Sequence, residues 1–428
     1  MFETICENAN WKDEMHKPLF MRACPATVCC VLETGRLDVT HSGDDDAAIF
    51  GFGERNNPRR SFLFVSNVLG RHVPVSPAVM RAAFTRLADT IPADVPGPVV
   101  MTGMAETAVG LGAGVHDAWI ARTGRRDTLY LSTTRARLDG PLLTTFREEH
   151  SHASDHLVHV PQHAADLDLL RAARTLIMVD DEASSGNTFR NLAAGLVAAG
   201  LDRIAHVHMA VLTDWSGPAG DRVLPDRSDI AVTRGALVRG TFHWTPAPGV
   251  PVRRLPDADR LRSGTVRPLR RGDDARLGRS VRTGPTLPAG LPEAIGQTRA
   301  RLLVIGTGEH VWEPFLLAEA LEGLGHDVRF CATTRSPILP GHAITRGYAF
   351  RDHEGLGITN YLYNVDPASA DRVILCADTA LTALDPALLA ALGADVVMGA
   401  VFHHRHDLAR LTTGVVPATG FVIEWAET

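Results

Sequence analysis

The residues best suited to chemistry lie in one stretch, residues 176–188, which reads L-I-M-V-D-D-E-A-S-S-G-N-T. Its four leading apolar residues predict a short buried strand, and two adjacent carboxylates, Asp180 and Asp181, follow them. The pattern from 189 to 199 then predicts a helix. Carboxylates accept hydrogen bonds from vicinal hydroxyls, while backbone N–H groups and hydroxyls at a helix N-terminus surround a phosphate. The stretch therefore predicts a sugar-phosphate site whose loop residues are Ser184, Ser185, Gly186, Asn187 and Thr188.

The elements that must position this site alternate along the first 250 residues. Strands are predicted at residues 61–65, 98–102, 128–132, 175–179 and 206–212, and helices at 77–89, 105–115 and 189–199. This spacing predicts an α/β fold of βαβ units around a mainly parallel sheet. In such sheets ligands bind at the carboxyl ends of the strands, which is where the acids and the loop fall.

The remainder of the chain predicts a linker and a second, smaller α/β domain. Residues 250–297 hold ten arginines, few apolar residues and a Gly/Pro-rich end, which favours a linker. A nucleic-acid-binding arm is the alternative, but interspersed aspartates and the lack of aromatic residues weaken it. Strands are predicted at residues 301–305, 327–332, 372–376 and 395–401, and helices at 312–324 and 385–392. We expect residues 1–45 as an N-terminal extension, 46–249 and 298–428 as domains, and 250–297 as the linker.

Composition narrows the class of protein. Of 428 residues, 45% are hydrophobic and 21% charged, which is ordinary for a globular chain, and the net charge of -6 gives no support to a nucleic-acid or membrane-surface role. No apolar run approaches the roughly 18 residues of a membrane span, and the first residues have no apolar signal region. Six scattered cysteines form no C-x-x-C pair, so we expect reduced thiols in the cytoplasm.

The stretch at 176–188 resembles the PRPP-binding signature of type I phosphoribosyltransferases. The resemblance implies that family's fold and a transfer of ribose phosphate from PRPP to a base with release of pyrophosphate. It also implies Mg²⁺, with Asp180 and Asp181 contacting the ion through water. The segment F-L-F-V-S-N-V-L-G-R-H from residue 62 takes the place of the family's first strand and pyrophosphate loop. It gives four pyrophosphate contacts: Ser66, Asn67, Gly70 and Arg71.

The family's flexible hood corresponds to residues 132–156. There Arg135 and Arg147 are candidates to clamp pyrophosphate, since arginine pairs well with phosphate. The resemblance makes catalytic candidates of Arg135, Glu149, His150 and His152. The H-S-H-A-S-D-H run also permits a zinc site, because His152 and His156 lie one helical turn apart. Plain surface histidines are the third interpretation.

One departure within the signature bears on the acceptor. Purine phosphoribosyltransferases of the salvage type carry Asp where this chain has Ser184, and orotate phosphoribosyltransferases carry Thr. A hydroxyl at this position favours an orotate-like loop over a loop that needs a carboxylate as base.

The second domain resembles the TRSP domain, through the string T-R-S-P at residues 334–337. That domain follows an orotate-phosphoribosyltransferase-like domain in proteins of tellurite-resistance and stress operons. Turns at two strand ends predict an anion site, and a dinucleotide fold is disfavoured because Val311 replaces the third glycine of G-x-G-x-x-G. A purely structural turn, with Arg335 in an internal ion pair, is the alternative. The second-domain site comprises Gly306, Thr307, Gly308, Glu309, Thr334, Arg335 and Ser336, and residues 355–364 look like another part of it.

These observations favour a Mg²⁺-dependent phosphoribosyltransferase that makes a nucleoside-like metabolite linked to stress or tellurite resistance. We expect PRPP and a base-like small molecule as ligands, and no nucleic-acid or membrane partner. The sequence does not fix the oligomeric state, for which a homodimer is one option. A PRPP-binding regulator without catalysis is the alternative. A third hypothesis makes the second domain a hydrolase or transferase that acts on the nucleotide.

Overall fold

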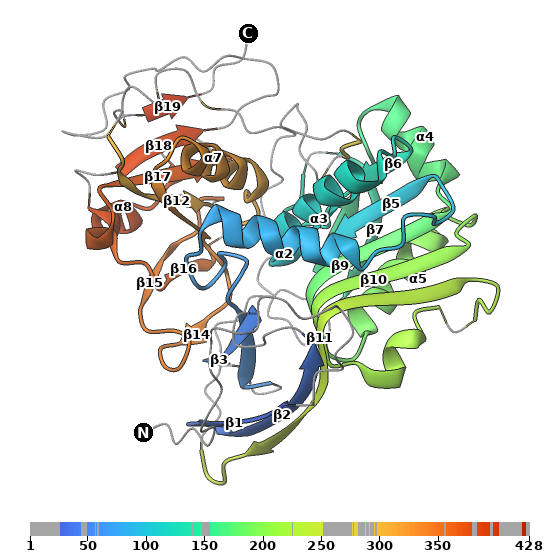
Figure 1. Cartoon of the computed structure of the whole chain (residues 1–428), viewed down its shortest axis with the longest axis horizontal. Helices are drawn as coiled ribbons and strands as arrows, with labels where there is room; N and C mark the ends of the chain where they lie inside the picture. The colour runs from blue at the N-terminus through green and yellow to red at the C-terminus, as the bar shows by residue number, and fades with distance from the viewer. Residues whose placement is uncertain are drawn as a thin grey trace, which may run out of the picture.

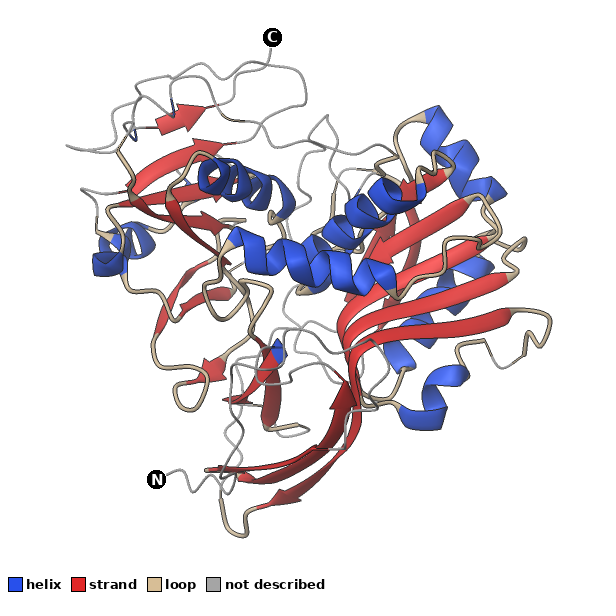
Figure 2. Cartoon of the chain, in the orientation of Figure 1, coloured by secondary structure: helices blue, strands red, loops and turns tan. Residues whose placement is uncertain are grey.

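The computed structural model describes two α/β parts, each built on its own sheet (Figures 1 and 2). The described residues are 26–43, 49–55, 57, 60–138, 140–147, 155–224, 226–250, 276, 278–280, 287, 291, 295, 298–354, 357–378, 383–393, 397–401 and 422–424.

The larger sheet has seven strands in the order β1-β2-β11-β10-β9-β5-β6. Its five consecutive strands from β11 to β6 are parallel, whereas β2 pairs antiparallel with both β11 and β1. The predicted mainly parallel sheet is confirmed, and residues 26–43 add two strands to its edge. The strands are β1 (Ala26–Leu32), β2 (Gly35–Gly43), β5 (Val99–Gly103), β6 (Thr128–Tyr130), β9 (Thr175–Ala183), β10 (His206–Asp214) and β11 (Ala231–Pro246).

Helices cover both faces of this sheet, which explains why its central strands are apolar runs without alternation. Ile177 and Val179 of β9 pack in the same core as α2 (Pro77–Asp89) and α3 (Ala108–Thr123). Leu176 and Met178 point to the other face, with α4 (Ala164–Ala172) and α5 (Asn187–Ala198). A short 3-10 helix, η1 (Gly217–Asp221), follows β10.

A smaller sheet combines the two halves of the chain. It has the order β14-β3-β4, with β3 (Phe50–Arg55), β4 (Phe62–Ser66) and β14 (Ile338–Leu339) all antiparallel. The strand predicted at 61–65 is therefore real, but its assignment as the first strand of the parallel sheet is wrong. That place belongs to β5, because β5 pairs with β9 and β4 pairs with β3.

The second domain is built on a parallel sheet in the order β13-β12-β17-β18-β19. A hairpin of β15 and β16 packs against one face together with α8. The strands are β12 (Arg301–Gly306), β13 (Asp327–Ala332), β15 (Gly347–Arg351), β16 (Thr359–Tyr363), β17 (Arg372–Ala377), β18 (Val397–Val401) and β19 (Val422–Glu424). The helices are α7 (Trp312–Gly323), η4 (Pro367–Ser369) and α8 (Pro386–Leu392).

One apolar core crosses from the first domain to the second. It joins residues of α2 and α3 to residues of α7, β12 and β13, and these helices lie between the sheets in Figure 1. Phe84 and Phe315 meet edge to face with ring centroids 5.2 Å apart. Above them, Arg81 donates hydrogen bonds of 2.6 and 2.8 Å to the carboxylate of Glu319. The two domains therefore share a packed boundary.

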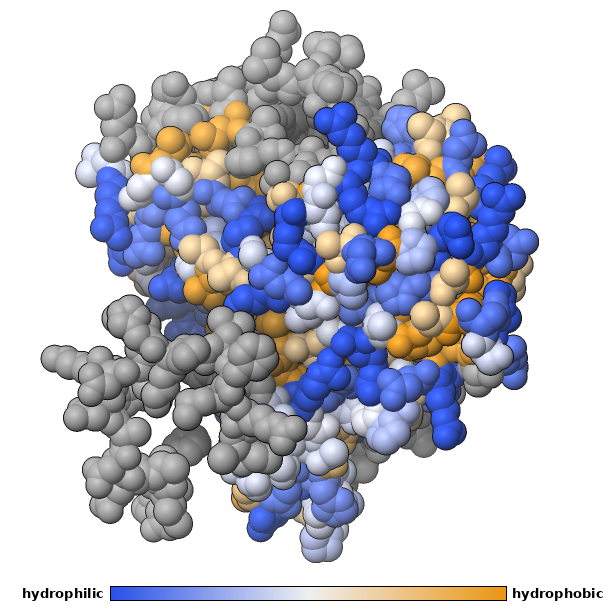
Figure 3. All heavy atoms as spheres, turned by 45° about the vertical axis from the view of Figure 1, so that its right-hand side comes forward, coloured by the Kyte–Doolittle hydropathy of each residue, from blue (hydrophilic) through white to orange (hydrophobic). Residues whose placement is uncertain are grey.

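Within the described part of the chain, no helix is both long enough and apolar enough to cross a membrane. Hydrophilic side chains separate the hydrophobic groups on the face drawn in Figure 3. The described residues visible on that face therefore form no single continuous apolar surface.

Candidate active site between the two domains

The acidic end of β9 lies where the sequence predicts it. Leu176 to Val179 are fully buried, while Asp180, Asp181 and Glu182 are half-buried at the carboxyl end of the strand. The Asp180 carboxylate accepts a 2.9 Å hydrogen bond from the backbone N–H of Asp181. Glu182 pairs with Arg60 at 2.6 Å. Polar groups thus begin at the point where the strand leaves the core.

The loop after β9 leads into α5 with the geometry of an anion site. Gly186 is the N-cap of α5 and has φ +75°, a left-handed conformation that favours glycine. Gly186 has no side chain with which to cap this helix, so a bound anion can supply acceptors at the helix N-terminus. The Ser185 hydroxyl accepts a 3.3 Å hydrogen bond from the N–H of Asn187, and Asn187 accepts one of 2.7 Å from Arg190. Ser184 and Thr188 are half-buried beside them.

The loop after β5 is a part of the site that the sequence did not reveal. The predicted helix at 105–115 begins later, at Ala108, so the residues between Gly103 and Ala108 form a turn. The N–H of Met104 donates a 3.1 Å hydrogen bond to the carbonyl of Val179, directly before Asp180. The N–H of Ala105 donates to the Thr133 hydroxyl at 2.8 Å. The only sequence signal was a glycine after a predicted strand.

The predicted pyrophosphate residues lie after β4, at the domain boundary. Ser66 is buried and accepts a 3.3 Å hydrogen bond from the N–H of Val68. Asn67 follows it, and its N–H donates to the carbonyl of Ile49 at 2.9 Å. Gly70 has φ +66°, and a Cβ there would lie 2.8 Å from the ring of Phe330 in the second domain. Close approach of the two domains therefore requires a glycine here.

Arg71 is buried and connects this loop to its surroundings. Its guanidinium donates to the carboxylate and carbonyl of Glu106, at 3.2 and 2.9 Å. It also donates to the carbonyls of Gly308 and Thr333, at 2.7 and 2.6 Å. Burial lowers the pKa of Arg71, against the opposing effect of Glu106, Glu309 and Asp181. Arg71 therefore joins the turn after β5 to the second domain.

The predicted hood is only partly described. It contains the antiparallel strands β7 (Leu142–Arg147) and β8 (Asp155–His159). Arg135 donates to the carbonyls of Ala105 and Asp155, both at 3.3 Å, and Arg147 forms an exposed pair with Asp155 at 3.0 Å. Three of the predicted catalytic residues, Glu149, His150 and His152, lie outside the described residues.

His156 is not a surface residue. Its ring is 1% exposed and stacks on Phe146 with centroids 4.5 Å apart. Its Nδ1 lies 3.0 Å from the Thr133 hydroxyl, which in turn accepts the N–H of Ala105. No group of three residues suited to a metal ion occurs in the described part of the chain. His156 thus supports the loop after β5 from behind.

The predicted second-domain residues face the first domain. Gly306 ends β12 and is followed by Thr307, Gly308 and Glu309, whereas Thr334, Arg335 and Ser336 come after β13. Arg335 pairs with Glu354 at 2.5 Å, as the structural interpretation of that turn expects, and its N–H donates to Glu106 at 3.4 Å. The carboxyl ends of both parallel sheets therefore meet at one boundary.

Two arginines of the predicted linker lie buried at this boundary. Arg279 exchanges backbone hydrogen bonds of 2.8 and 2.9 Å with Tyr130, and its guanidinium lies 5.3 Å from the ring centroid of Trp312. Arg276 pairs with Asp378 at 3.1 Å. Both contacts attach this segment to the folded domains.

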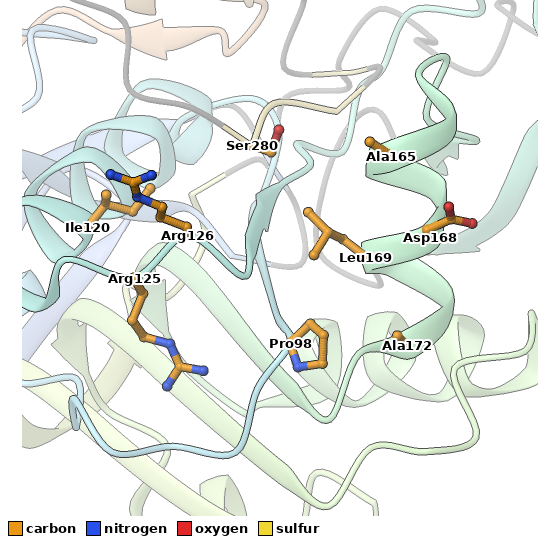
Figure 4. A pocket seen from close by; sticks show the side chains of 9 residues that line it. All are labelled: Pro98, Ile120, Arg125, Arg126, Ala165, Asp168, Leu169, Ala172 and Ser280. Atoms are coloured by element: carbon orange, nitrogen blue, oxygen red, sulfur yellow. The ribbon is translucent and has the colours of Figure 1, made fainter.

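A cavity of about 760 Å³ lies elsewhere, at the amino ends of β5 and β6 (Figure 4). Its lining includes Pro98, Arg125, Arg126 and Leu169, and Arg125 is already paired with Asp127 at 2.7 Å. The anion-binding loop and the acids lie at the opposite end of the sheet. We therefore place the candidate site at the strand ends and not in this cavity.

Comparison with known structures finds several phosphoribosyltransferases. The adenine phosphoribosyltransferase of Rhodothermus marinus is 17% identical, with 44% of this chain and 94% of that chain covered and a TM-score of 0.29. That of Trypanosoma brucei, solved with AMP, pyrophosphate and ribose-5-phosphate, is 11% identical, covering 44% and 76% with a TM-score of 0.30. The orotate phosphoribosyltransferase of Aeropyrum pernix is 16% identical, covering 41% and 79% with a TM-score of 0.25. Scores this low do not bear on the site.

Family comparisons are more direct, although no curated protein matches the chain significantly. Residues 49–241 match the family PRTase_2, described as phosphoribosyl transferase. Residues 275–392 match the TRSP domain, described as C-terminal to PRTase_2. The predicted type I phosphoribosyltransferase resemblance and the TRSP resemblance are thereby confirmed. Residues 49–241 are therefore a phosphoribosyl transferase domain, and a TRSP domain follows it at residues 275–392.

Proposed function

We propose that this phosphoribosyltransferase is Mg²⁺-dependent, and that it transfers ribose phosphate from PRPP to a base-like acceptor and releases pyrophosphate. The observation that carries the proposal is the end of β9. There Asp180 and Asp181 precede the N-terminus of α5, whose N-cap, Gly186, has no capping side chain. The two acids suit the hydroxyls of a ribose, and the helix N-terminus one short loop later suits its phosphate.

Each part of the site has a role in this reaction. Asp180 and Asp181 accept hydrogen bonds from the ribose hydroxyls, and the N–H groups and hydroxyls of residues 184–188 hold the 5′-phosphate. The bond between C1 and the pyrophosphate oxygen breaks while the acceptor forms its bond on the opposite face, which inverts C1. Because the transition state is oxocarbenium-like, positioning and electrostatics supply the catalysis. Arg135 and the predicted hood residues Glu149, His150 and His152 complete the proposed catalytic set.

The two half-buried carboxylates at the end of β9, Asp180 and Asp181, supply the oxygen atoms for the proposed magnesium ion. Two carboxylates suffice for contact through water, because Mg²⁺ prefers oxygen ligands and keeps several of its waters. When bound, the ion neutralises charge on the leaving pyrophosphate. In this proposal Asp180 and Asp181 hold it through water.

Further parts of the proposal rest on the sequence. Ser184 places a hydroxyl where purine-specific relatives carry an acid, so we propose an acceptor that needs no carboxylate base from this loop. The TRSP resemblance implies a nucleoside-like product linked to stress or tellurite resistance. The six cysteines form no C-x-x-C pair, which favours a reducing compartment, the cytoplasm. A homodimer is one option for the assembly.

A direct test is incubation of the full chain with PRPP, Mg²⁺ and a cell metabolite extract, followed by mass spectrometry for ribosylated products. We expect a new product and pyrophosphate, and a loss of turnover of roughly 100-fold or more in Asp180→Asn/Asp181→Asn. The matched control is Asp229→Asn, an exposed aspartate that pairs with Arg227 at 2.8 Å. Unchanged PRPP consumption in the double variant contradicts the site. PRPP binding without pyrophosphate release against any base favours the regulator.

A further inference from the structure

The carboxylate of Glu309 crosses the domain boundary and takes up anion-binding donors of the first domain. One oxygen accepts the backbone N–H of Arg135 at 2.6 Å, and the other accepts the Thr134 hydroxyl at 2.5 Å. Both donors follow β6, beside the turn after β5. A backbone N–H next to a hydroxyl is a donor set that phosphate oxygens also use.

Arg276 of the predicted linker and Arg335 of the second domain complete these surroundings. Nη1 of Arg276 lies 3.8 Å from the Glu309 carboxylate. The pKa of Glu309 is raised by burial, although Arg276 and Arg335 act in the opposite direction. Burial acts to lower the pKa of Arg335, but Glu354, Glu106 and Glu309 together raise it. The Glu309 carboxylate thus accepts two neutral donors, lies near Arg276 and is under the electrostatic influence of Arg335.

Each of these arginines keeps another carboxylate when Glu309 is removed. Arg276 has Asp378 at 3.1 Å, and Arg335 has Glu354 at 2.5 Å. Departure of Glu309 therefore leaves neither cation without an acidic partner. Exchange of its carboxylate for another anion also keeps the local charge close to the one that the fold already accommodates.

Two buried donors near this cluster are unused in the described part of the chain. They are Nη1 of Arg335 and the hydroxyl of Thr307, which have no hydrogen-bond partner there. An unsatisfied buried donor is costly, by roughly 1–3 kcal/mol, and calls for an explanation. A ligand with more acceptor oxygens than one carboxylate would supply partners.

The turn that carries Glu309 is built to allow the exchange. Gly308 has φ +57°, and its N–H donates to the Thr333 hydroxyl at 2.8 Å. Glycines at 306 and 308 flank Thr307, and α7 begins at Trp312, so the positive end of that helix faces the same boundary. The Glu309 side chain has three rotatable bonds with which to leave the donors.

We propose that Thr134, the N–H of Arg135, Arg276 and Arg335 form an interdomain site for a phosphoryl group, which Glu309 occupies until the ligand replaces it. The site is made by both domains, so a phosphorylated ligand bound there contacts the TRSP domain and the loop after β6 together. It needs no catalysis, and so goes beyond the proposed function. A purely structural ion network is the competing explanation.

The test compares full-length Glu309→Ala and Glu309→Gln with the wild type by calorimetry, without Mg²⁺. The probes are inorganic phosphate, pyrophosphate and ribose 5-phosphate. Removal of the competing carboxylate should raise affinity for at least one probe roughly ten-fold, with a smaller gain for the glutamine variant. Adding Thr134→Val to Glu309→Ala should reverse the gain. Glu33→Ala, at an exposed position in the turn between β1 and β2, is the control and should change nothing.

Separate outcomes decide the proposal. Wild-type affinity in a folded Glu309→Gln variant, or a gain that Thr134→Val does not reverse, overturns it. If Glu309→Ala does not fold, Glu309→Gln alone decides, since its amide keeps the size and can still accept the Arg135 N–H. The titration is then repeated with Asp180→Asn/Asp181→Asn added to Glu309→Ala. This distinguishes the interdomain site from the proposed PRPP site at the end of β9. A gain that persists there supports the inference even if no ribosylated product is found.

Discussion

The Arg71 guanidinium donates a 2.6 Å hydrogen bond to the carbonyl of Thr333, across the boundary between the two domains and over 262 positions of sequence. The same side chain holds Glu106 in the turn after β5. A buried cation therefore fixes the candidate active-site loop and the second domain to each other.

Replacing Arg71 by Met should strongly destabilise the protein. The substitution leaves the Glu106 carboxylate and the carbonyls of Gly308 and Thr333 without their donor in a buried place. Loss of one partner from a buried charged network costs roughly 3–5 kcal/mol, which chemical denaturation can measure. Arg346→Met is the comparison, because Arg346 and Asp366 form an exposed pair, which adds little to stability. Equal losses in the two variants contradict this account of Arg71.

Thr133→Val should impair the reaction more than the fold. The hydroxyl accepts the N–H of Ala105 and contacts His156, so its loss frees the loop after β5. We expect a rise in the KM for PRPP that lowers kcat/KM roughly ten-fold, with a stability loss of about 1–2 kcal/mol. Thr133→Ser should restore the kinetics, and Thr85→Val, which removes an exposed helix hydroxyl, should leave them unchanged. A stability loss with unaltered KM would make Thr133 merely structural.

Several structural features follow directly from the sequence, for local reasons. The predicted limits of α2 are those observed, because Ser76 caps it and Pro77 occupies its first turn. The run 176–179 predicts β9 because a strand buried on both faces is continuously apolar. The loop after β5 was missed because Ala105 extends an apolar pattern that resembles a helix. The contacts of Arg71 with Glu106 and of Glu309 with Thr134 are tertiary contacts, which no local pattern encodes.

Buried histidines should make the protein sensitive to acid. Burial, with a further effect of Arg279, lowers the pKa of His116 from 6.5 to about 3. As pH falls below 6.5 the unfolded chain binds a proton that the native state refuses, so stability falls by up to about 1.4 kcal/mol per pH unit. His116→Gln removes this titrating group, so the free energy of unfolding should fall less steeply between pH 6.5 and 4. Urea denaturation at several pH values measures that slope. Parallel curves for the wild type and His116→Gln would contradict the expectation.

The shared core predicts that the two domains unfold together. Phe315 of α7 is fully buried and contacts Phe84 of the first domain and Phe330 of the second. Phe315→Ala should therefore lower stability by roughly 3–5 kcal/mol, because a cavity opens between both sheets. Calorimetry should show one transition at a lower temperature, since loss of this core weakens both domains at once. Leu324→Ala, at an exposed position after the same helix, should shift the transition little. Two separated transitions in the wild type, only one of which moves in Phe315→Ala, would mean that the domains are stable independently and meet without mutual support.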